Sequence, residues 1–214
     1  MQVEAFAARL AEVRVVPVVT IDDAADAVGL AEALAQGGLP MAEVTFRTAA
    51  AADAIAAIRA ARPDALVGAG TVLDPATVDR AVDAGAEFIV APGFGPAVVA
   101  RAAERGVAML PGAATPTEIE MALAAGLSLV KFFPAEASGG VGYIRAIAAP
   151  YREVRFVPTG GVTAANLAAY LALPAVVACG GTWIAPPDAI RNHRWEAIGA
   201  AAAEAVAIGR RAAS

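Results

Sequence analysis

Short runs of apolar residues alternate along the chain with longer segments that are rich in alanine. The short runs have the length of buried strands, and the longer segments contain strong helix formers. Runs without an exposed face are typical of parallel strands that are covered on both sides. The pattern predicts strands near Arg14–Val19, Met41–Phe46, Leu66–Gly70, Phe88–Ala91, Ala108–Pro111, Leu127–Phe133, Val154–Pro158 and Ala175–Cys179.

Helices are predicted between successive strands, and several have recognisable starts. Pro75, Pro96 and Pro116 stand where a first helical turn tolerates proline. Asp74 and Thr115 precede two of these prolines as N-cap residues. The predicted helices lie near Asp23–Gln36, Ala50–Ala61, Pro75–Ala84, Pro96–Arg105, Pro116–Ala124, Val141–Ala148 and Ala164–Leu171.

The strict alternation of strands and helices predicts an α/β protein with a parallel sheet, and it favours a small closed (β/α)8 TIM barrel. An open doubly wound sheet is the alternative, but no G-x-G-x-x-G motif follows the first strand. Helices near Val3–Val13 and Trp195–Arg210 are additions to the barrel, the first of them an extra N-terminal helix. Because no linker separates two parts, residues 1–214 are predicted to form a single domain.

Composition narrows the range of partners. The mean hydropathy of +0.61 is high, but the longest uncharged stretch, Phe156–Pro187, is repeatedly interrupted by proline and glycine. It therefore offers no continuous apolar helix of about 20 residues that would span a membrane. The net charge of -5 gives no electrostatic reason to expect nucleic acid or an anionic membrane as a partner.

The N-terminus and the single cysteine favour the cytoplasm. Glu4, Arg9 and Glu12 interrupt the apolar segment that a secretory signal needs. Cys179 has no second cysteine to pair with, and its apolar surroundings predict a small buried side chain. The only histidine, His193, lies in a polar stretch without companion ligands, so we predict a surface position, no metal and no organic cofactor.

Lys131 is the only lysine of the chain, whose other basic residues are all arginines. The task that lysine performs and arginine cannot is to become a neutral amine. Lys131 stands in an apolar strand, where alternation predicts that it points into the barrel if Val130 and Phe132 face the helices. Burial favours the uncharged amine, which attacks carbonyl carbons. We predict a Schiff-base lysine; the alternative is a lysine paired in a buried ion network.

Two further groups of polar residues stand at predicted strand ends. Glu43, Thr45 and Arg47 have the spacing of one strand face, which suits a general base and a carboxylate clamp, or else a local salt bridge. Gly68 and Gly70 permit close approach of a ligand to the third strand, and the hydroxyl of Thr71 is expected to donate to a substrate carboxylate.

Two glycine pairs follow the last two predicted strands. Glycine-rich turns that lead into helices bind phosphate through backbone N–H groups, and barrels commonly place phosphate at these two loops. We therefore predict a phosphate site here, with ordinary turns as the alternative. The two segments are Thr159, Gly160 and Gly161, and Gly180, Gly181 and Thr182.

Taken in order, these motifs resemble the family of 2-keto-3-deoxy-6-phosphogluconate (KDPG) and 4-hydroxy-2-oxoglutarate (KHG) aldolases. The resemblance extends from Val13 to about Ile184. It implies a class I aldolase on a (β/α)8 barrel, typically a homotrimer, that needs no cofactor and yields pyruvate. The segments that carry it are Glu43–Thr48, Gly68–Val72, Lys131–Glu136, Pro158–Gly161 and Gly180–Trp183.

The resemblance also implies roles for the site residues. Lys131 forms the Schiff base and Glu43 transfers protons; Glu43 is preferred over Glu136 because it shares a predicted strand face with Arg47. The substrate-binding residues are Arg47 and Thr71 on the pyruvate carboxylate, Pro92 and Phe133 in the pocket wall, and Gly160, Gly161, Gly181 and Thr182 around the phosphate.

One departure and two alternatives accompany this interpretation. Family members often carry serine at the position of Thr182, whose extra methyl group bears on the preference for phosphorylated aldehydes. A sister aldolase acting on the galactonate-derived epimer would retain the same lysine chemistry. A phosphate-binding barrel without catalysis, or an engineered oligomeric scaffold, would keep only the fold.

Overall fold

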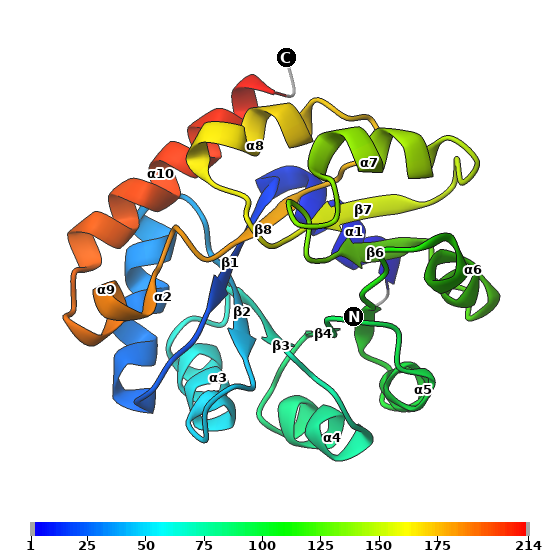
Figure 1. Cartoon of the computed structure of the whole chain (residues 1–214). Coiled ribbons are helices and arrows are strands. Elements are labelled where there is room, and N and C mark those ends of the chain that lie inside the picture. The colour runs from blue at the N-terminus through cyan, green and yellow to red at the C-terminus, as the bar shows by residue number, and fades with distance from the viewer. Residues whose placement is uncertain (1–2, 213–214) are drawn as a thin grey trace.

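A computed structural model describes residues 3–212 and contains eight strands, all paired in parallel. They lie at the centre of the molecule, and the helices surround them (Figure 1). The strands are β1 (Val15–Val19), β2 (Met41–Thr45), β3 (Leu66–Gly70), β4 (Phe88–Val90), β5 (Ala108–Leu110), β6 (Leu129–Phe132), β7 (Arg155–Pro158) and β8 (Cys179–Gly181).

Ten α-helices and one 3-10 helix are present among the described residues. The predicted caps Asp74 and Thr115 both accept a hydrogen bond from the first turn of their helices. The helices are α1 (Val3–Val13), η1 (Ala24–Asp26), α2 (Ala27–Gln36), α3 (Ala51–Ala61), α4 (Pro75–Asp83), α5 (Pro96–Glu104), α6 (Pro116–Ala124), α7 (Gly140–Ala148), α8 (Ala164–Leu171), α9 (Pro187–Arg191) and α10 (Trp195–Arg211).

The strands are divided between two curled sheets rather than one continuous sheet. Six of them follow the order β5-β4-β3-β2-β1-β8, and β6 pairs with β7. Isolated bridges join the two sheets, from Gly112 to Lys131 on one side and from Thr159 to Gly180 on the other. β5 ends before Pro111, which has no N–H to donate but accepts a hydrogen bond of 2.8 Å from Lys131 N–H.

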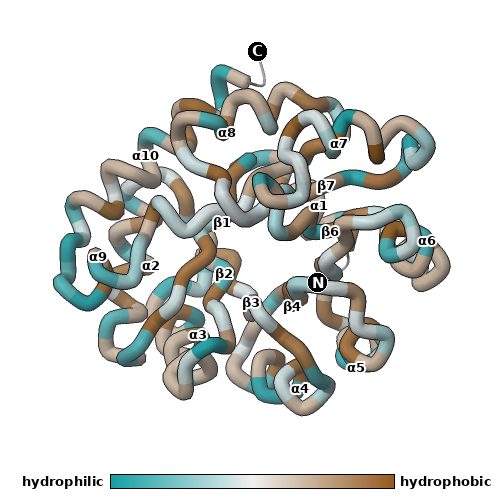
Figure 2. The backbone as a smooth tube through the Cα atoms, viewed as in Figure 1, coloured by the Kyte–Doolittle hydropathy of each residue, from teal (hydrophilic) through white to brown (hydrophobic). Residues whose placement is uncertain are grey.

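Side chains of alternate strand residues fill two separate cores. Val130 and Phe132 belong to the outer core between strands and helices, whereas Leu129 belongs to the inner core between the strands. The predicted orientation of β6 is therefore confirmed, because these neighbours alternate between its two faces. In Figure 2 many of the hydrophilic segments lie at the outer edge of the molecule.

The predicted N-terminal helix α1 is confirmed and packs against one end of the inner core. It lies behind the strands in the view of Figure 1. Phe6 and Leu10 are buried there, and the ring of Phe6 stacks on Phe88 with centroids 4.6 Å apart. Aromatic pairs of this kind add stability beyond the area that they bury. None of the helices in the described part of the chain is long and apolar enough to cross a membrane.

The last strand was predicted wrongly. The apolar run Ala175–Cys179 suggested β8, but ladder pairing with β1 begins only at Cys179, opposite Val15, and extends to Gly181. Val176 forms a single bridge to Phe156 instead. The glycine pair therefore lies inside the strand and not in a turn after it. Short α9, which proline introduces, was also not predicted.

Candidate active site

Two ionisable side chains meet between the two curled sheets. Lys131 on β6 and Glu43 on β2 are both buried, with 7% and 3% of their side chains exposed. The Lys131 amine donates a hydrogen bond of 2.9 Å to Glu43 Oε1. A buried charge is costly without a partner, and here the ammonium and the carboxylate are each other's partner. The prediction that Lys131 points inward is confirmed.

A glycine on the neighbouring strand makes room for this pair. A Cβ added to Gly70 would lie 2.7 Å from Glu43 Cγ and 2.9 Å from its carboxyl carbon. The space beside Gly68 is likewise filled, by the ring of Phe88. We predicted that these glycines admit a ligand; the structure instead places protein side chains against them.

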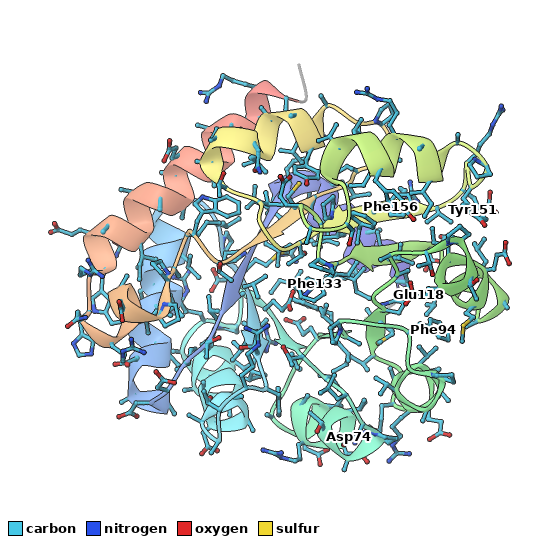
Figure 3. All side chains as sticks on the ribbon, viewed as in Figure 1. Asp74, Phe94, Glu118, Phe133, Tyr151 and Phe156 are labelled. Carbon is cyan, nitrogen blue, oxygen red and sulfur yellow. The ribbon has the colours of Figure 1, made fainter. Side chains whose placement is uncertain are left out.

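An aromatic ring lies beside the lysine. The Lys131 amine is 5.7 Å from the ring centroid of Phe133, within the range of a cation–π contact. Phe133 follows β6 and is half-buried. It lies near the centre of the molecule (Figure 3). The amine therefore has a carboxylate and an aromatic ring as neighbours.

The predicted strand face of Glu43, Thr45 and Arg47 holds only in part. Thr45 is buried, donates a hydrogen bond of 3.0 Å to the Val19 carbonyl and thereby ties β2 to β1. β2 ends at Thr45, so Arg47 lies in the following turn and is exposed. The alternation that joins the three residues in the sequence does not continue beyond the strand.

The predicted carboxylate and pocket residues Thr71 and Pro92 follow β3 and β4. Both are half-buried, and Thr71 has a left-handed backbone with φ of 58°. Pro92 lines a cavity of about 380 Å³ together with Phe94, Leu73 and Glu118. Phe94 and Glu118 are labelled in Figure 3. Lys131 and Glu43 do not line this cavity, so it is separate from the buried pair.

The first glycine pair forms the loop between β7 and α8. Gly160 and Gly161 have φ of 96° and 81°, which favour glycine. The Gly160 carbonyl accepts a hydrogen bond of 3.0 Å from the Glu136 N–H. The Gly161 carbonyl accepts one of 3.0 Å from the Asn166 side chain. With the carbonyls held, the N–H groups of Gly161 and Val162 point the opposite way, because peptide units are planar and trans.

The second glycine pair lies beside the first, since Thr159 bridges to Gly180. Gly180 and Gly181 are buried within β8, where the side chain of Thr159 and the ring of Trp183 occupy the space beside them. Glycine in a strand often marks such a close approach. Thr182 follows the strand and is exposed.

Glu136 is not part of the buried pair. Its carboxylate accepts a hydrogen bond from the hydroxyl of Tyr170, which is buried in α8. Burial, and then the contact with Glu136, raise the pKa of the Tyr170 hydroxyl. Glu43, and not Glu136, therefore contacts the lysine. Sequence reasoning did not identify Tyr170, whose position reads as an ordinary apolar residue of a helix.

The other singled-out residues lie elsewhere. Cys179 is buried, as predicted, and burial raises the pKa of its thiol. His193 is exposed, as predicted, and contacts Asp26 at 2.7 Å. Among residues 3–212 no group of three or more His, Cys, Asp and Glu side chains is arranged to hold a metal ion.

The family model and the relatives that this sequence matches all point to the same family. A family model described as KDPG and KHG aldolase matches residues 6–201. The 2-dehydro-3-deoxy-phosphogluconate aldolase of Treponema pallidum is 55% identical over 181 residues, which are 85% of this chain and 86% of the relative. The KHG/KDPG aldolase of Escherichia coli is 44% identical over 192 residues, 90% of each chain.

Solved structures agree with the sequences. The KDPG aldolase of Legionella pneumophila, with pyruvate captured as a covalent carbinolamine intermediate, has a TM-score of 0.89 at 39% identity over 92% of this chain and 96% of that one. The enzyme of Zymomonas mobilis with 3-phosphoglycerate has a TM-score of 0.87 at 40% identity, covering 94% and 95%. A native KDPGal structure has a TM-score of 0.83 at 31% identity, covering 93% and 95%.

Proposed function

The chain belongs to the KDPG and KHG aldolase family, and on this basis we propose that it is a class I aldolase, a carbon–carbon lyase. It cleaves KDPG to pyruvate and glyceraldehyde 3-phosphate, and KHG to pyruvate and glyoxylate. The observation that carries the proposal is the buried contact of 2.9 Å between the only lysine and Glu43. A class I aldolase needs this combination of an enclosed amine and an adjacent acid–base group.

In the proposed reaction Glu43 accepts a proton from Lys131 across their hydrogen bond, and the neutral amine attacks the C2 ketone and forms a carbinolamine. Glu43 returns this proton to the departing hydroxyl, and loss of water gives an iminium, which serves as an electron sink. Glu43 removes the C4 hydroxyl proton through a water molecule, and the C3–C4 bond breaks. The aldehyde leaves and an enamine remains. Glu43 then returns the proton to C3, and hydrolysis releases pyruvate without a cofactor.

The substrate carboxylate is assigned to Arg47 and Thr71. Arg47 has no ion pair among the described residues, so its guanidinium is available for the two parallel hydrogen bonds that a carboxylate accepts. Thr71 keeps a left-handed backbone at the end of β3, a conformation that is costly for threonine and is often found at functional sites. Pro92 and Phe133 are assigned to the wall around the bound pyruvate, Phe133 because its ring lies beside the Lys131 amine.

The phosphate is assigned to the paired glycine segments. The N–H groups of Gly161 and Val162 have no partner among residues 3–212, and the loop leads into the N-terminus of α8. Both features favour an anion. Thr159, Gly160, Gly180, Gly181 and Thr182 complete the assigned site, because the Thr159–Gly180 bridge places the two segments side by side.

The gluconate-derived epimer is the preferred substrate in this proposal. A relative named for it is 55% identical, whereas the KDPGal structure is 31% identical. Cleavage assays with both epimers distinguish the two. Preference for the galactonate-derived epimer would overturn this assignment but not the lysine chemistry.

We also propose that the two sheets form one closed eight-stranded barrel and that the protein is a homotrimer. The isolated bridges at both junctions support closure. Leu73, with 66% of its surface exposed beside the cavity at Phe94, supports burial against another copy. Light scattering after size-exclusion chromatography tests the trimer.

Reduction with borohydride in the presence of pyruvate tests the central proposal. Reductive amination adds the atoms of pyruvate less one oxygen, and peptide mapping separates Lys131 from the N-terminal amine, the only other primary amine. We expect the adduct on Lys131 and none in the Lys131→Arg variant, which keeps a cation beside Glu43 but forms no imine. That variant is expected to lose turnover at least about a thousandfold, since covalent catalysis is removed. An unmodified Lys131 in the wild-type protein contradicts the proposal.

A further inference from the structure

We propose that the hydrogen bond from Tyr170 to Glu136 holds the Gly160–Gly161 loop in its phosphate-binding shape and thereby sets the preference for phosphorylated over unphosphorylated substrate. This rests on the proposed function, since it concerns the same site. Tyr170 and Glu136 are positioning residues in this proposal: they act on the loop and do not touch the reacting atoms.

The turn that carries Glu136 is fastened directly to the loop. Glu136 lies in the turn after β6, shortly beyond Lys131. Its N–H donates to the Gly160 carbonyl at 3.0 Å, and the Ala135 N–H donates to the Thr159 carbonyl at 2.8 Å. Two backbone hydrogen bonds therefore couple the strand end that carries the lysine to the loop assigned to the phosphate.

The side chain of Glu136 packs against the backbone of the Gly160–Gly161 loop. A Cβ added at Gly161 would lie 2.6 Å from both Cβ and Cγ of Glu136, so the glycine backbone lies directly against this side chain. If the side chain of Glu136 turned away, Gly161 would lose its packing surface. The positive φ of Gly161 costs glycine little, and the loop is then free to adopt other conformations.

Tyr170 fixes that side chain. It is fully buried in α8, the helix that the loop enters, and its hydroxyl donates to Glu136 Oε1. A buried hydroxyl needs a partner, and within residues 3–212 that partner is Glu136. The helix, the tyrosine, the glutamate and the loop therefore form one connected support, so the direction of the Gly161 and Val162 N–H groups depends on it.

Comparison of the two substrates distinguishes an effect on the phosphate loop from an effect on catalysis. KDPG carries a phosphate at the aldehyde end, and KHG ends before that position. Loosening of the loop is therefore expected to raise the KM for KDPG and to leave KHG cleavage unchanged. A loss of general stability or of the lysine chemistry would affect both substrates alike.

The test compares Tyr170→Phe, Glu136→Ala and Glu136→Gln with the wild-type protein. Tyr151→Phe is the matched control, because Tyr151 also donates to a glutamate, Glu120, at 2.9 Å, and lies at the periphery of the molecule (Figure 3). We measure kcat and KM for KDPG and for KHG, borohydride trapping with pyruvate, and folding by circular dichroism.

Loss of this partly buried hydrogen bond predicts a KM for KDPG raised about five- to tenfold in Tyr170→Phe and Glu136→Ala, with KHG kinetics within about twofold of wild type. Glu136→Gln is expected to keep the wild-type KM, because its amide oxygen still accepts the Tyr170 hydroxyl. Tyr151→Phe is expected to change neither substrate.

An unchanged KM for KDPG in Tyr170→Phe, or an equal loss with both substrates, would overturn the positioning role. If Tyr170→Phe does not fold, the contrast between Glu136→Ala and Glu136→Gln decides the question, because Glu136 is exposed. Absence of the wild-type pyruvate adduct would reject the proposed function itself. An adduct with an unchanged KM ratio rejects only the positioning role.

Discussion

The space beside Gly70 allows a sharp test of the buried pair. In Gly70→Ala the new Cβ would lie 2.7 Å from Glu43 Cγ and 2.9 Å from the carboxyl carbon, where ordinary contacts begin at 3.4 Å. Gly70 does not have a left-handed backbone, so alanine introduces no conformational strain. The three nearest atoms all belong to Glu43, so this side chain must move away by more than half an ångström.

The size of the effect follows from this displacement. Overpacking of a buried position costs about 1–3 kcal/mol of unfolding free energy. Misplacement of a catalytic group by about 1 Å costs on the order of a hundredfold in rate, so a smaller shift of Glu43 predicts a loss of roughly ten- to a hundredfold in kcat. The amine of Lys131 is not removed, so pyruvate trapping should remain.

The assay measures kcat with both KDPG and KHG, together with urea unfolding and borohydride trapping. Gly68→Ala is the matched control on the same strand, because its Cβ would meet the ring of Phe88 and not Glu43. We expect Gly68→Ala to lose stability but to keep its turnover per folded molecule. Gly70→Ala is expected to lose turnover with both substrates, since Glu43 serves both reactions.

Two outcomes would refute this reasoning. Full turnover in folded Gly70→Ala would show that Glu43 does not need its observed position beside Lys131. An equal loss of turnover in Gly68→Ala would show that overpacking of β3 in general, and not displacement of Glu43, reduces the rate.

Two further predictions concern ionisable groups outside the pair. Burial raises the pKa of the Cys179 thiol, so we expect no reaction with a thiol reagent at pH 8 until urea unfolds the chain; fast labelling of the folded protein would contradict this. Burial opposes the charge of Glu118, but hydrogen bonds from Ala114 and Thr115 outweigh it and lower its pKa. Stability from such a carboxylate is complete above the unfolded pKa of about 4.3 and is lost as the pH falls through the folded value. The difference in urea midpoint between wild type and Glu118→Ala should therefore be constant above about pH 6 and shrink in acid; a difference that grows in acid would contradict the sign.

Local patterns were sufficient for most elements and for the orientation of the lysine. The bounds of β3, α6 and α8 agree with the prediction to the residue. Alternation along β6 placed Lys131 on the inner face, because the outer positions Val130 and Phe132 are large and apolar. These features depend on neighbours in the sequence, which is the information that a periodic pattern contains.

Distances across the molecule could not be predicted in this way. Glu43 and Lys131 stand on β2 and β6, which are not paired in either sheet. Their contact depends on the curvature that brings both inner faces together, and the sequence indicates only that each residue lies on such a face. The contact between Glu136 and Tyr170 likewise depends on the three-dimensional fold, because it joins the turn after β6 to a residue of α8.

Glycine shows most clearly where sequence reasoning ends, because the same residue serves different physical needs. Gly160 and Gly161 require a left-handed backbone, and this conformation directs the N–H groups that we assign to phosphate. Gly180 and Gly181 sit in β8 without that conformation, and they are needed because Thr159 and Trp183 fill the adjacent space. The two Gly-Gly motifs read alike in the sequence. In the structure the first pair shapes the loop and the second makes room for the side chains of Thr159 and Trp183, so substitution of the second pair should act through packing rather than through backbone strain.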